Sequence, residues 1–284
     1  MNGILYLCTT PIGNLGDISQ RCLETLASVD IIACEDTRRT LQLLNHFGIK
    51  NQLTSYHEHN KAEKGKVIIE MLKSGKSAAL VSDAGTPAIS DPGEDLVRLC
   101  IENGITVTSV PGCVAGITAL ILSGLSTRRF AFEGFLSVNK RHRTEHLKSL
   151  KNDTHTLIFY EAPHKLTRTL ADMLEILGNR KIAIVRELTK IHEEVIHTDL
   201  EKAQSLYLEN SPKGEFVLII EGAKEIEAEN FWDNLTVSEH IEKYIKDGES
   251  VKDAIKKAAK DRNLPKHDVY NIYHKIDGED ENDR

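Results

Sequence analysis

The chain has 284 residues, 40% of them apolar and 28% charged, which fits a globular protein of two domains with room for a small third. No apolar run approaches the ~20 residues that span a membrane, and no signal peptide pattern opens the chain, so we expect a cytoplasmic protein without a membrane partner. The five cysteines are odd in number and unpaired by spacing, which favours reduced thiols. The formal net charge of −7 excludes a uniformly basic nucleic-acid binder.

Residues 1–124 alternate short apolar runs with helical patterns, which predicts an N-terminal α/β domain with a mostly parallel sheet. The expected strands are 4–8, 30–34, 77–82 and 105–110. The expected helices are 18–28, 37–47, 61–73, 93–103 and 114–123. Asp17 and Gln20 have the spacing of a capping box, and we expect them to start the first helix.

Loops rich in Gly and Pro follow three of these strands, at 8–17, 82–93 and 111–113. Open α/β sheets bind ligands at the carboxyl ends of their strands, so the three loops predict one shared pocket. Asp83 is placed there to accept hydrogen bonds from hydroxyl, amine or amide donors. Neither the dinucleotide-binding pattern G-x-G-x-x-G nor the phosphate-binding pattern G-x-x-x-x-G-K-[ST] is present. The mixed lining favours a ligand with an adenosine part and no phosphate chain.

A second α/β domain is expected at 125–222, followed by an acidic linker at 223–236. Its expected strands are 130–136, 154–160, 181–187 and 215–221, and its expected helices are 140–150, 164–177 and 199–208. Helices at 238–246, 250–261 and 266–275 predict a small module at 237–276 that resembles a helix-turn-helix, before a disordered acidic tail at 277–284.

Basic residues gather in two segments, 140–151 and 252–275. A local basic surface is what binding to RNA phosphates requires, whatever the net charge of the whole protein. The alternative is that both segments are solvated helix faces without a ligand.

Six motifs in a fixed order carry a family resemblance. They are TTPIGNLGDIS (9–19), CEDTRRT (34–40), SDAGTPAISDPG (82–93), SVPGCVAGITAL (109–120), FYEAPHK (159–165) and RELTKIHEE (186–194). Together they closely resemble the tetrapyrrole-methylase-like superfamily and, within it, the ribosomal RNA small-subunit methyltransferase I branch, over residues 3–222 with a weaker match at 237–275. The resemblance implies two α/β domains with a cofactor cleft between them, S-adenosylmethionine as cofactor, and a homodimer. It also implies 2′-O-methylation of a cytidine ribose in the decoding region of 16S rRNA in the 30S subunit.

The resemblance also implies the cofactor-binding residues. They are Pro11, Ile12, Asp83, Thr86, Cys113, Val114, Tyr160, Glu161 and Gly214. Ser82 stands where the broader superfamily has a glycine, and the loop to the following helix is longer here, so within this loop the resemblance carries over most directly to Asp83.

Methyl transfer to a ribose hydroxyl needs alignment of the reacting atoms and removal of the hydroxyl proton. The candidate bases or orienting acids are Glu35, Asp36, Glu161 and Glu187, although any one of them alone more often caps a helix or pairs with an arginine. The candidate RNA-binding residues are Arg38, Arg141, Arg143, Lys190, Lys256 and Lys257. No Cys/His cluster has metal-ligand spacing, so we expect no metal.

The sequence leaves two other functions open. Other branches of the superfamily methylate corrinoid or porphyrinoid rings, but a flat macrocycle needs neither the basic segment at 140–151 nor the helical module. A non-catalytic RNA- or ribosome-binding protein would not need intact cofactor loops, and a cofactor-binding measurement separates it from an enzyme.

Overall fold

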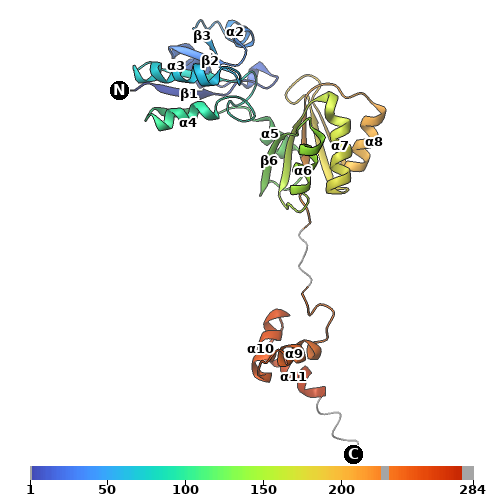
Figure 1. The fold of residues 1–284 in the computed structure, drawn as a ribbon. Coiled ribbons are helices and arrows are strands. Elements are labelled where there is room, and N and C mark those ends of the chain that lie inside the picture. Colours follow the sequence, from blue (N-terminus) through green and yellow to red (C-terminus); the bar gives the residue numbers. More distant parts are fainter. Residues whose placement is uncertain (1, 225–229, 277–284) are drawn as a thin grey trace, which may run out of the picture. The chain divides into compact units, whose positions relative to one another are not determined.

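The computed structural model describes residues 2–224 and 230–276, and the chain divides into two compact units, Met1–Lys224 and Glu225–Arg284 (Figure 1). The tail expected at 277–284 lies outside the described residues, as do residues 225–229 of the expected linker. None of the helices in the described ranges combines the length and hydropathy needed to cross a bilayer.

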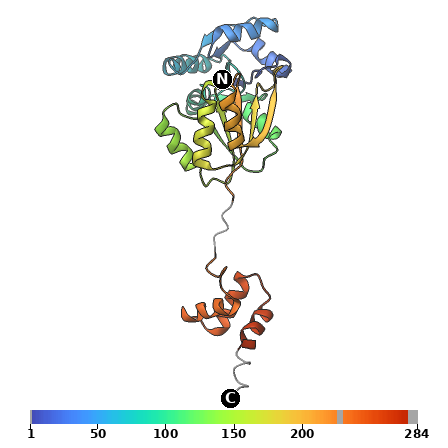
Figure 2. The ribbon, with the colours of Figure 1, turned by 90° about the vertical axis from the view of Figure 1, so that its right-hand side faces the viewer.

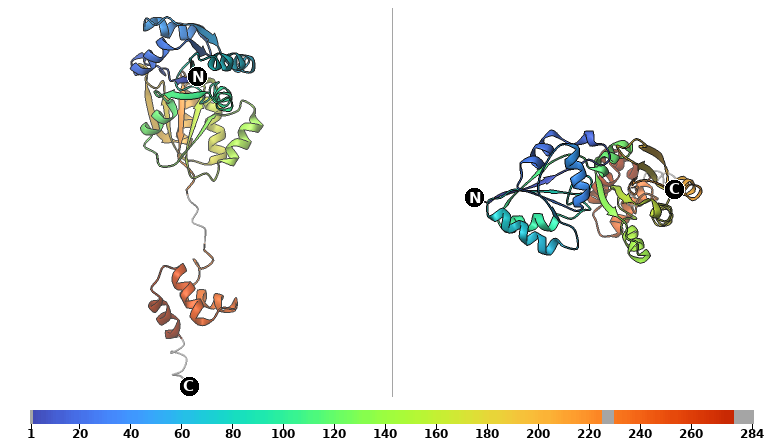
Figure 3. Two further views of the ribbon diagram at one scale, coloured as in Figure 1. Left: turned by 90° about the vertical axis from the view of Figure 1, so that its left-hand side faces the viewer. Right: turned by 90° about the horizontal axis from the view of Figure 1, so that it is seen from above.

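The first half of the larger unit is a parallel sheet of order β3-β2-β4-β1-β5. Its strands are β1 (Ile4–Cys8), β2 (Ile31–Cys34), β3 (Leu53–Ser55), β4 (Ala78–Val81) and β5 (Thr106–Val110). The helices that follow the strands are α1 (Gln20–Ser28), α2 (Thr37–His46), α3 (Lys61–Lys73), α4 (Glu94–Glu102) and α5 (Ala115–Leu122). Helices α3 and α4 cover one face and α1 and α2 the other, so β2 and β4 are buried along their whole length (Figure 3).

The second half is a mixed sheet of order β6-β7-β10-β8-β9, in which only β6 and β7 run parallel. Its strands are β6 (Phe130–Phe135), β7 (Thr156–Glu161), β8 (Lys181–Arg186), β9 (Glu194–Asp199) and β10 (Phe216–Ile220). Its helices are α6 (Lys140–Ser149), α7 (Pro163–Leu177) and α8 (Leu200–Glu209), and all three pack on one face. Helix α5, which follows β5 of the first sheet, covers the other face of the second sheet through Ala119 and Leu120 and so connects the two halves.

The smaller unit is a bundle of α9 (Val237–Lys246), α10 (Val251–Asp261) and α11 (Lys266–Ile276) (Figure 2). Ile241, Ile255 and Val269 are at most 2% exposed and form its core. The Arg262 guanidinium donates to the Trp232 carbonyl at 2.8 Å. Residues 230–236, which the sequence assigns to the linker, therefore pack against this bundle.

The expected fold class, two α/β halves with a helical module, is confirmed, but two strands and one helix start differ from the prediction. Strands β3 and β9 were not expected from the sequence pattern. Asp17 and Gln20 do not form the first helix cap: residues 15–17 make a separate 3₁₀ turn, and the Ser19 hydroxyl accepts from the Cys22 amide at 3.2 Å. The Ser19 side chain reaches the free N–H groups of the first turn, so α1 begins after it.

Candidate active site

Three loops at the carboxyl edge of the first sheet are bonded to one another. The Thr10 amide donates to the Gly85 carbonyl at 2.9 Å, and the Gly85 amide donates back to the Thr10 carbonyl at 3.1 Å. The Thr86 hydroxyl donates to the Cys113 carbonyl, in the loop after β5, at 3.0 Å. Gly85 has a φ of +81°, and a Cβ there would lie 3.2 Å from the Ile12 side chain, so this crossing requires glycine. The predicted convergence of the three loops is confirmed.

A cavity of about 370 Å³, here called the apolar cavity, opens between these loops and the second sheet. Its apolar lining includes Ile12, Ile89, Ala115, Phe135, Tyr160, Val185, Leu188 and Val217. The charged side chains among the described residues that line it are all acidic: Asp83, Asp91, Glu161 and Glu215. Four carboxyl groups beside apolar walls disfavour a phosphate and favour a cation or a donor of hydrogen bonds.

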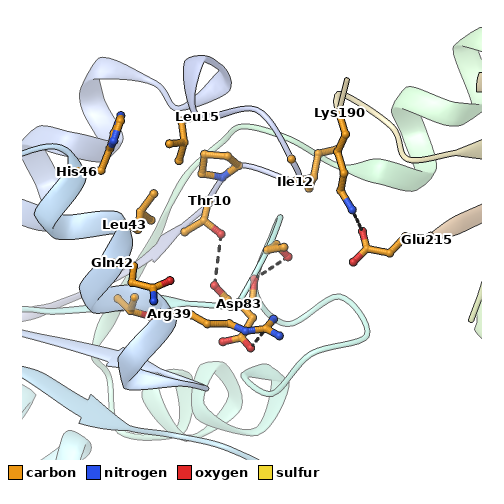
Figure 4. A pocket seen from close by; sticks show the side chains of 15 residues that line it. Thr10, Ile12, Leu15, Arg39, Gln42, Leu43, His46, Asp83, Lys190 and Glu215 are labelled. Atoms are coloured by element: carbon orange, nitrogen blue, oxygen red, sulfur yellow. Dashed lines mark hydrogen bonds and ion pairs between the residues drawn. The ribbon is translucent and has the colours of Figure 1, made fainter. Parts of the chain in front are cut away.

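A second cavity of about 480 Å³, here called the polar cavity, adjoins the first (Figure 4). The two share four lining residues, which are Ile12, Asp83, Ala84 and Glu215. Unlike the apolar cavity, the polar cavity is also lined by the basic residues Arg39, His46 and Lys190. The site thus offers an acidic, apolar compartment and a basic, polar compartment that meet at a common wall.

Asp83, at the end of β4, is held at that wall by partners from α2 and the residue before it. Its Oδ1 accepts from the Asp36 amide at 3.0 Å, and its Oδ2 lies 3.2 Å from Nη1 of Arg39 (Figure 4). The carboxylate is therefore fixed in orientation where the cavities meet. The sequence singled out Asp83 but not Arg39, although Arg39 lies within the CEDTRRT motif.

Asp91 lines the apolar cavity and was missed in the sequence analysis, although it belongs to the same 82–93 loop. Burial, together with the nearby Glu35 and Asp83 charges, raises the pKa of its carboxyl to about 6. Ala88 and Ser90, just before it, have φ of +66° and +64°, a strained conformation for residues other than glycine. A strained loop thus places an acid that titrates near neutral pH in the cavity wall.

Tyr160 and Glu161, at the end of β7, close the opposite wall. The Gly116 amide donates to the Tyr160 hydroxyl at 3.0 Å, which ties the second sheet to α5. The Glu161 carboxylate is 3% exposed and accepts from the Thr169 hydroxyl at 2.5 Å and from the Ala162 amide at 2.8 Å. Both of its oxygens are therefore engaged within the protein, which suits a positioning role better than proton transfer.

The other three candidate acids differ in their surroundings. Burial and the Asp83 charge raise the pKa of Glu35. Hydrogen bonds from Arg38 lower the pKa of Asp36 to about 2, and the same carboxylate caps α2. A hydrogen bond from Lys190 lowers the pKa of Glu187. Asp36 and Glu187 are therefore weak bases, and Glu35 is the stronger base of the three.

The remaining candidate cofactor-binding residues lie at several positions in and around the two cavities. Pro11 lines the polar cavity, while Val114 is the residue before α5. Thr86 and Cys113 join two of the loops. Gly214 has a φ of +95°, and a Cβ there would lie 2.7 Å from Glu187, so its observed role is to make room for that side chain.

Arg143 does not fit the expectation that it binds RNA. Its side chain is 2% exposed, and its Nε lies 2.5 Å from the Asp172 carboxylate of α7. Its Nη1 donates to the Ser137 and Val138 carbonyls. Arg143 faces inward because α6 packs on α7. Arg141, on the same helix, faces solvent instead.

The other basic candidates are accessible to differing degrees. Arg38 and Arg141 are exposed and pair with Asp36 and Glu145. Lys190 donates to Glu187 and Glu215 in the cavity wall. On α10, Lys256 is exposed, and Lys257 pairs with Glu249. No group of three or more His, Cys, Asp or Glu side chains is placed to hold a metal ion within the described part of the chain.

A family comparison agrees with this architecture. The model of the tetrapyrrole (corrin/porphyrin) methylases matches residues 5–204. Among solved structures, uroporphyrin-III-C-methyltransferase from Thermus thermophilus is 19% identical, with a TM-score of 0.55 over 76% of this chain and 94% of that one. Diphthine synthase gives a TM-score of 0.58 at 15% identity, over 77% of this chain and 90% of that one. At these identities the likeness is one of fold.

Two curated relatives make the assignment narrower. The ribosomal RNA small subunit methyltransferase I of Halalkalibacterium halodurans is 53% identical over 96% of this chain and 95% of its own length. The protein of the same name from Bacillus subtilis is 50% identical over 96% of this chain and 94% of its own length. The chain therefore belongs to the tetrapyrrole methylase family and, within it, to the ribosomal RNA small subunit methyltransferase I group.

Proposed function

We propose that the protein transfers a methyl group from S-adenosylmethionine to the 2′-hydroxyl of a cytidine ribose in the decoding region of 16S rRNA. The observation that carries the proposal is the pair of adjoining cavities, one acidic and apolar and one basic and polar. Names of relatives at about half identity support an rRNA substrate. The choice of the cytidine 2′-hydroxyl as the methylated group rests on the family resemblance of the motifs.

The apolar cavity suits the cofactor by the chemistry of its lining. S-adenosylmethionine supplies a methyl group on a positively charged sulfur, and it carries an ammonium group, ribose hydroxyls and a flat base. Asp83 and Asp91 offer acceptors to the cationic groups and hydroxyls, and Ile12 and Tyr160 offer apolar surface to the base. Glu161, whose oxygens are engaged within the protein, positions the wall beside them. A phosphate-bearing cofactor would meet these carboxylates without a compensating cation.

The polar cavity suits the nucleotide. Arg39 and Lys190 supply positive charge to RNA phosphates, and the shared wall would bring the ribose next to the methyl group. An in-line displacement moves the bonding electron pair to sulfur as the new O–C bond forms, and the hydroxyl proton must pass to a base. Asp91 and Glu35 are the acids with raised pKa near Asp83, and we assign the proton to Asp91, which lines the apolar cavity that adjoins the polar one.

Labelled methyl transfer tests the proposal directly. The purified protein is incubated with labelled S-adenosylmethionine and, in parallel, 30S subunits, free 16S rRNA or uroporphyrinogen, and labelled RNA is mapped by nucleotide. We expect label on one ribose of the decoding region and none on the macrocycle. Label on uroporphyrinogen alone would establish a small-molecule methyltransferase, and cofactor binding without transfer to any substrate would also contradict the proposal.

We also propose a homodimer that forms through α5 and β6. Both elements carry exposed apolar side chains: Ile117, Ile121, Leu122, Phe130, Phe132 and Phe135. A concentration of exposed apolar side chains marks an interaction surface, and Phe135 also lines the apolar cavity. Light scattering should give a dimer at micromolar concentration. Ile121→Asp should give a monomer, whereas Ile101→Asp, at an exposed position of α4, should not.

The helical module is proposed to add RNA affinity. Lys252, Lys256 and Lys260 are exposed on α10 at intervals of one helical turn, so they share a face. Basic side chains arranged in this way bind phosphates without reading sequence. The module would then raise affinity for the ribosomal substrate while the larger unit performs the transfer.

A further inference from the structure

The turn between β8 and β9 presents one apolar side chain entirely to solvent. Ile191, at its tip, is 97% exposed. The turn is nevertheless well fixed, because the Lys190 amide donates to the Glu187 carbonyl at 2.9 Å and the Thr189 amide donates to the Glu193 carboxylate at 2.6 Å. Glu187 and Thr189 have φ of +52° and +68°, so the backbone adopts a strained shape to hold this tip.

The tip stands at the mouth of the proposed RNA compartment. Residues 189–192 line a surface hollow together with Gly13, Asn14 and Leu15 of the loop after β1. Lys190, directly before the tip, and Leu15 also line the polar cavity (Figure 4). A nucleotide that enters the polar cavity would therefore pass beside Ile191.

A ribose within a stacked RNA helix cannot enter a cavity unless its nucleotide leaves the stack. Proteins that extract nucleotides insert apolar side chains between bases to fill the space that opens. We infer that Ile191 is such a wedge, which enters the base stack of the target RNA and holds the target nucleotide in the polar cavity; the inference rests on the proposed RNA substrate.

RNA suits this tip better than a second copy of the chain. A stable protein interface buries about 800 Å² on each partner, whereas the turn offers one isoleucine flanked by Lys190, His192 and Asn14. A single apolar side chain between polar and basic neighbours matches a base stack bordered by phosphates. The extended apolar surface of α5 and β6 is the better match for another protein.

The test compares Ile191→Ser with Ile101→Ser, a matched variant at an isoleucine that is 68% exposed on α4. The substrates are 30S subunits and a short single-stranded RNA with the same target sequence. We expect Ile191→Ser to lower kcat/KM on 30S subunits by about 10- to 100-fold, because the wedge would offset part of the free energy that unstacking a nucleotide costs. It should leave transfer to the single strand and cofactor affinity unchanged, because neither requires unstacking. Ile191→Leu should restore transfer.

A fluorescent base analogue next to the target reports unstacking itself. With the wild-type protein its emission should rise on binding, and with Ile191→Ser the rise should be absent. Equal activity of Ile191→Ser and Ile101→Ser on 30S subunits would overturn the wedge while leaving the proposed function intact. A shift of Ile191→Ser to monomers in light scattering would also overturn it, in favour of a contact between copies. Failure of the wild-type protein to methylate either RNA would overturn the proposed function and the wedge together.

Discussion

At the scale of single residues, Asp83 and Glu215 are the two carboxylates that line both cavities, and removal of Asp83 gives the clearest test of the cofactor site. Asp83→Ala removes an acceptor from ligand donors and leaves Arg39 without its partner. We expect cofactor affinity to fall by about 5- to 150-fold, the effect of leaving a buried donor unpaired at ~1–3 kcal/mol. Calorimetry measures the affinity, with Glu102→Ala on α4 as the control. If Asp83→Ala binds the cofactor with wild-type affinity, Asp83 does not contribute to cofactor binding.

If Asp91 accepts the hydroxyl proton, as proposed, methyl transfer should depend on pH. Its pKa of about 6 lies above the ordinary aspartate value because the group is partly buried and Glu35 and Asp83 are close. A base must be deprotonated to act, so kcat/KM should rise as pH increases through about 6 and then level off. Asp91→Asn should lower kcat strongly and abolish this inflection. An unchanged pH profile in the variant would assign the proton to another acid, with Glu35 as the next to test.

The same shift affects stability with a definite sign. Between the ordinary aspartate value and about 6, the folded protein binds a proton at Asp91 that the unfolded chain has released. The free energy of unfolding should therefore decrease as pH rises through that window, and Asp91→Asn should flatten the decrease. Urea unfolding at a series of pH values measures it.

At the scale of elements, the Arg143–Asp172 pair joins α6 to α7 across the core of the second half. Arg143→Ala would leave a carboxylate with little access to water and no partner, which typically costs about 3–5 kcal/mol. Arg141→Ala, two residues away, removes an exposed pair with Glu145 and should cost at most about 1 kcal/mol. Urea unfolding of both variants provides a matched comparison. Equal free energies of unfolding would show that the buried pair does not hold the helices together.

The elements also show where sequence patterns suffice and where they do not. Buried parallel strands such as β4 are continuous apolar runs next to Gly/Pro loops, so their places and the meeting of the loops follow from the pattern. Strand β3 has three residues, too few for a period, and β9 is half-exposed and reads Glu-Val-Ile-His-Thr-Asp, without the apolar enrichment of a core strand.

Site residues divide in a similar way. Asp83 comes shortly after a strand and belongs to a recognisable motif, so the sequence identifies it. The raised pKa of Asp91 depends on burial and on charges that folding brings close to it. The burial of the Arg143 side chain could likewise not be predicted from the sequence, because a run of basic residues on one helix does not by itself show which of them contacts α7. Basic composition predicts that a segment is charged, but tertiary packing decides which charges reach solvent.

At the scale of the whole molecule, each unit has its own hydrophobic core, so the units can be separated experimentally. The cofactor candidates all lie in the larger unit, and the exposed lysine face of α10 lies in the smaller one. This division predicts that cofactor binding and part of the RNA affinity respond to different changes.

Removal of residues 225–284 should therefore weaken binding to 30S subunits while leaving cofactor affinity unchanged. Replacing Lys252, Lys256 and Lys260 by Gln should have a similar but smaller effect without removing any element. Each lysine that no longer neutralises a phosphate should reduce the slope of log affinity against log salt by about one, so the triple variant should reduce it by up to about three. The control is Lys64→Gln with Lys73→Gln on α3, which changes charge in the larger unit. If the truncated protein keeps its KM for 30S subunits and its salt dependence, the module is not an RNA-binding element, and the phosphates must be bound by residues such as Arg39 and Lys190 at the polar cavity.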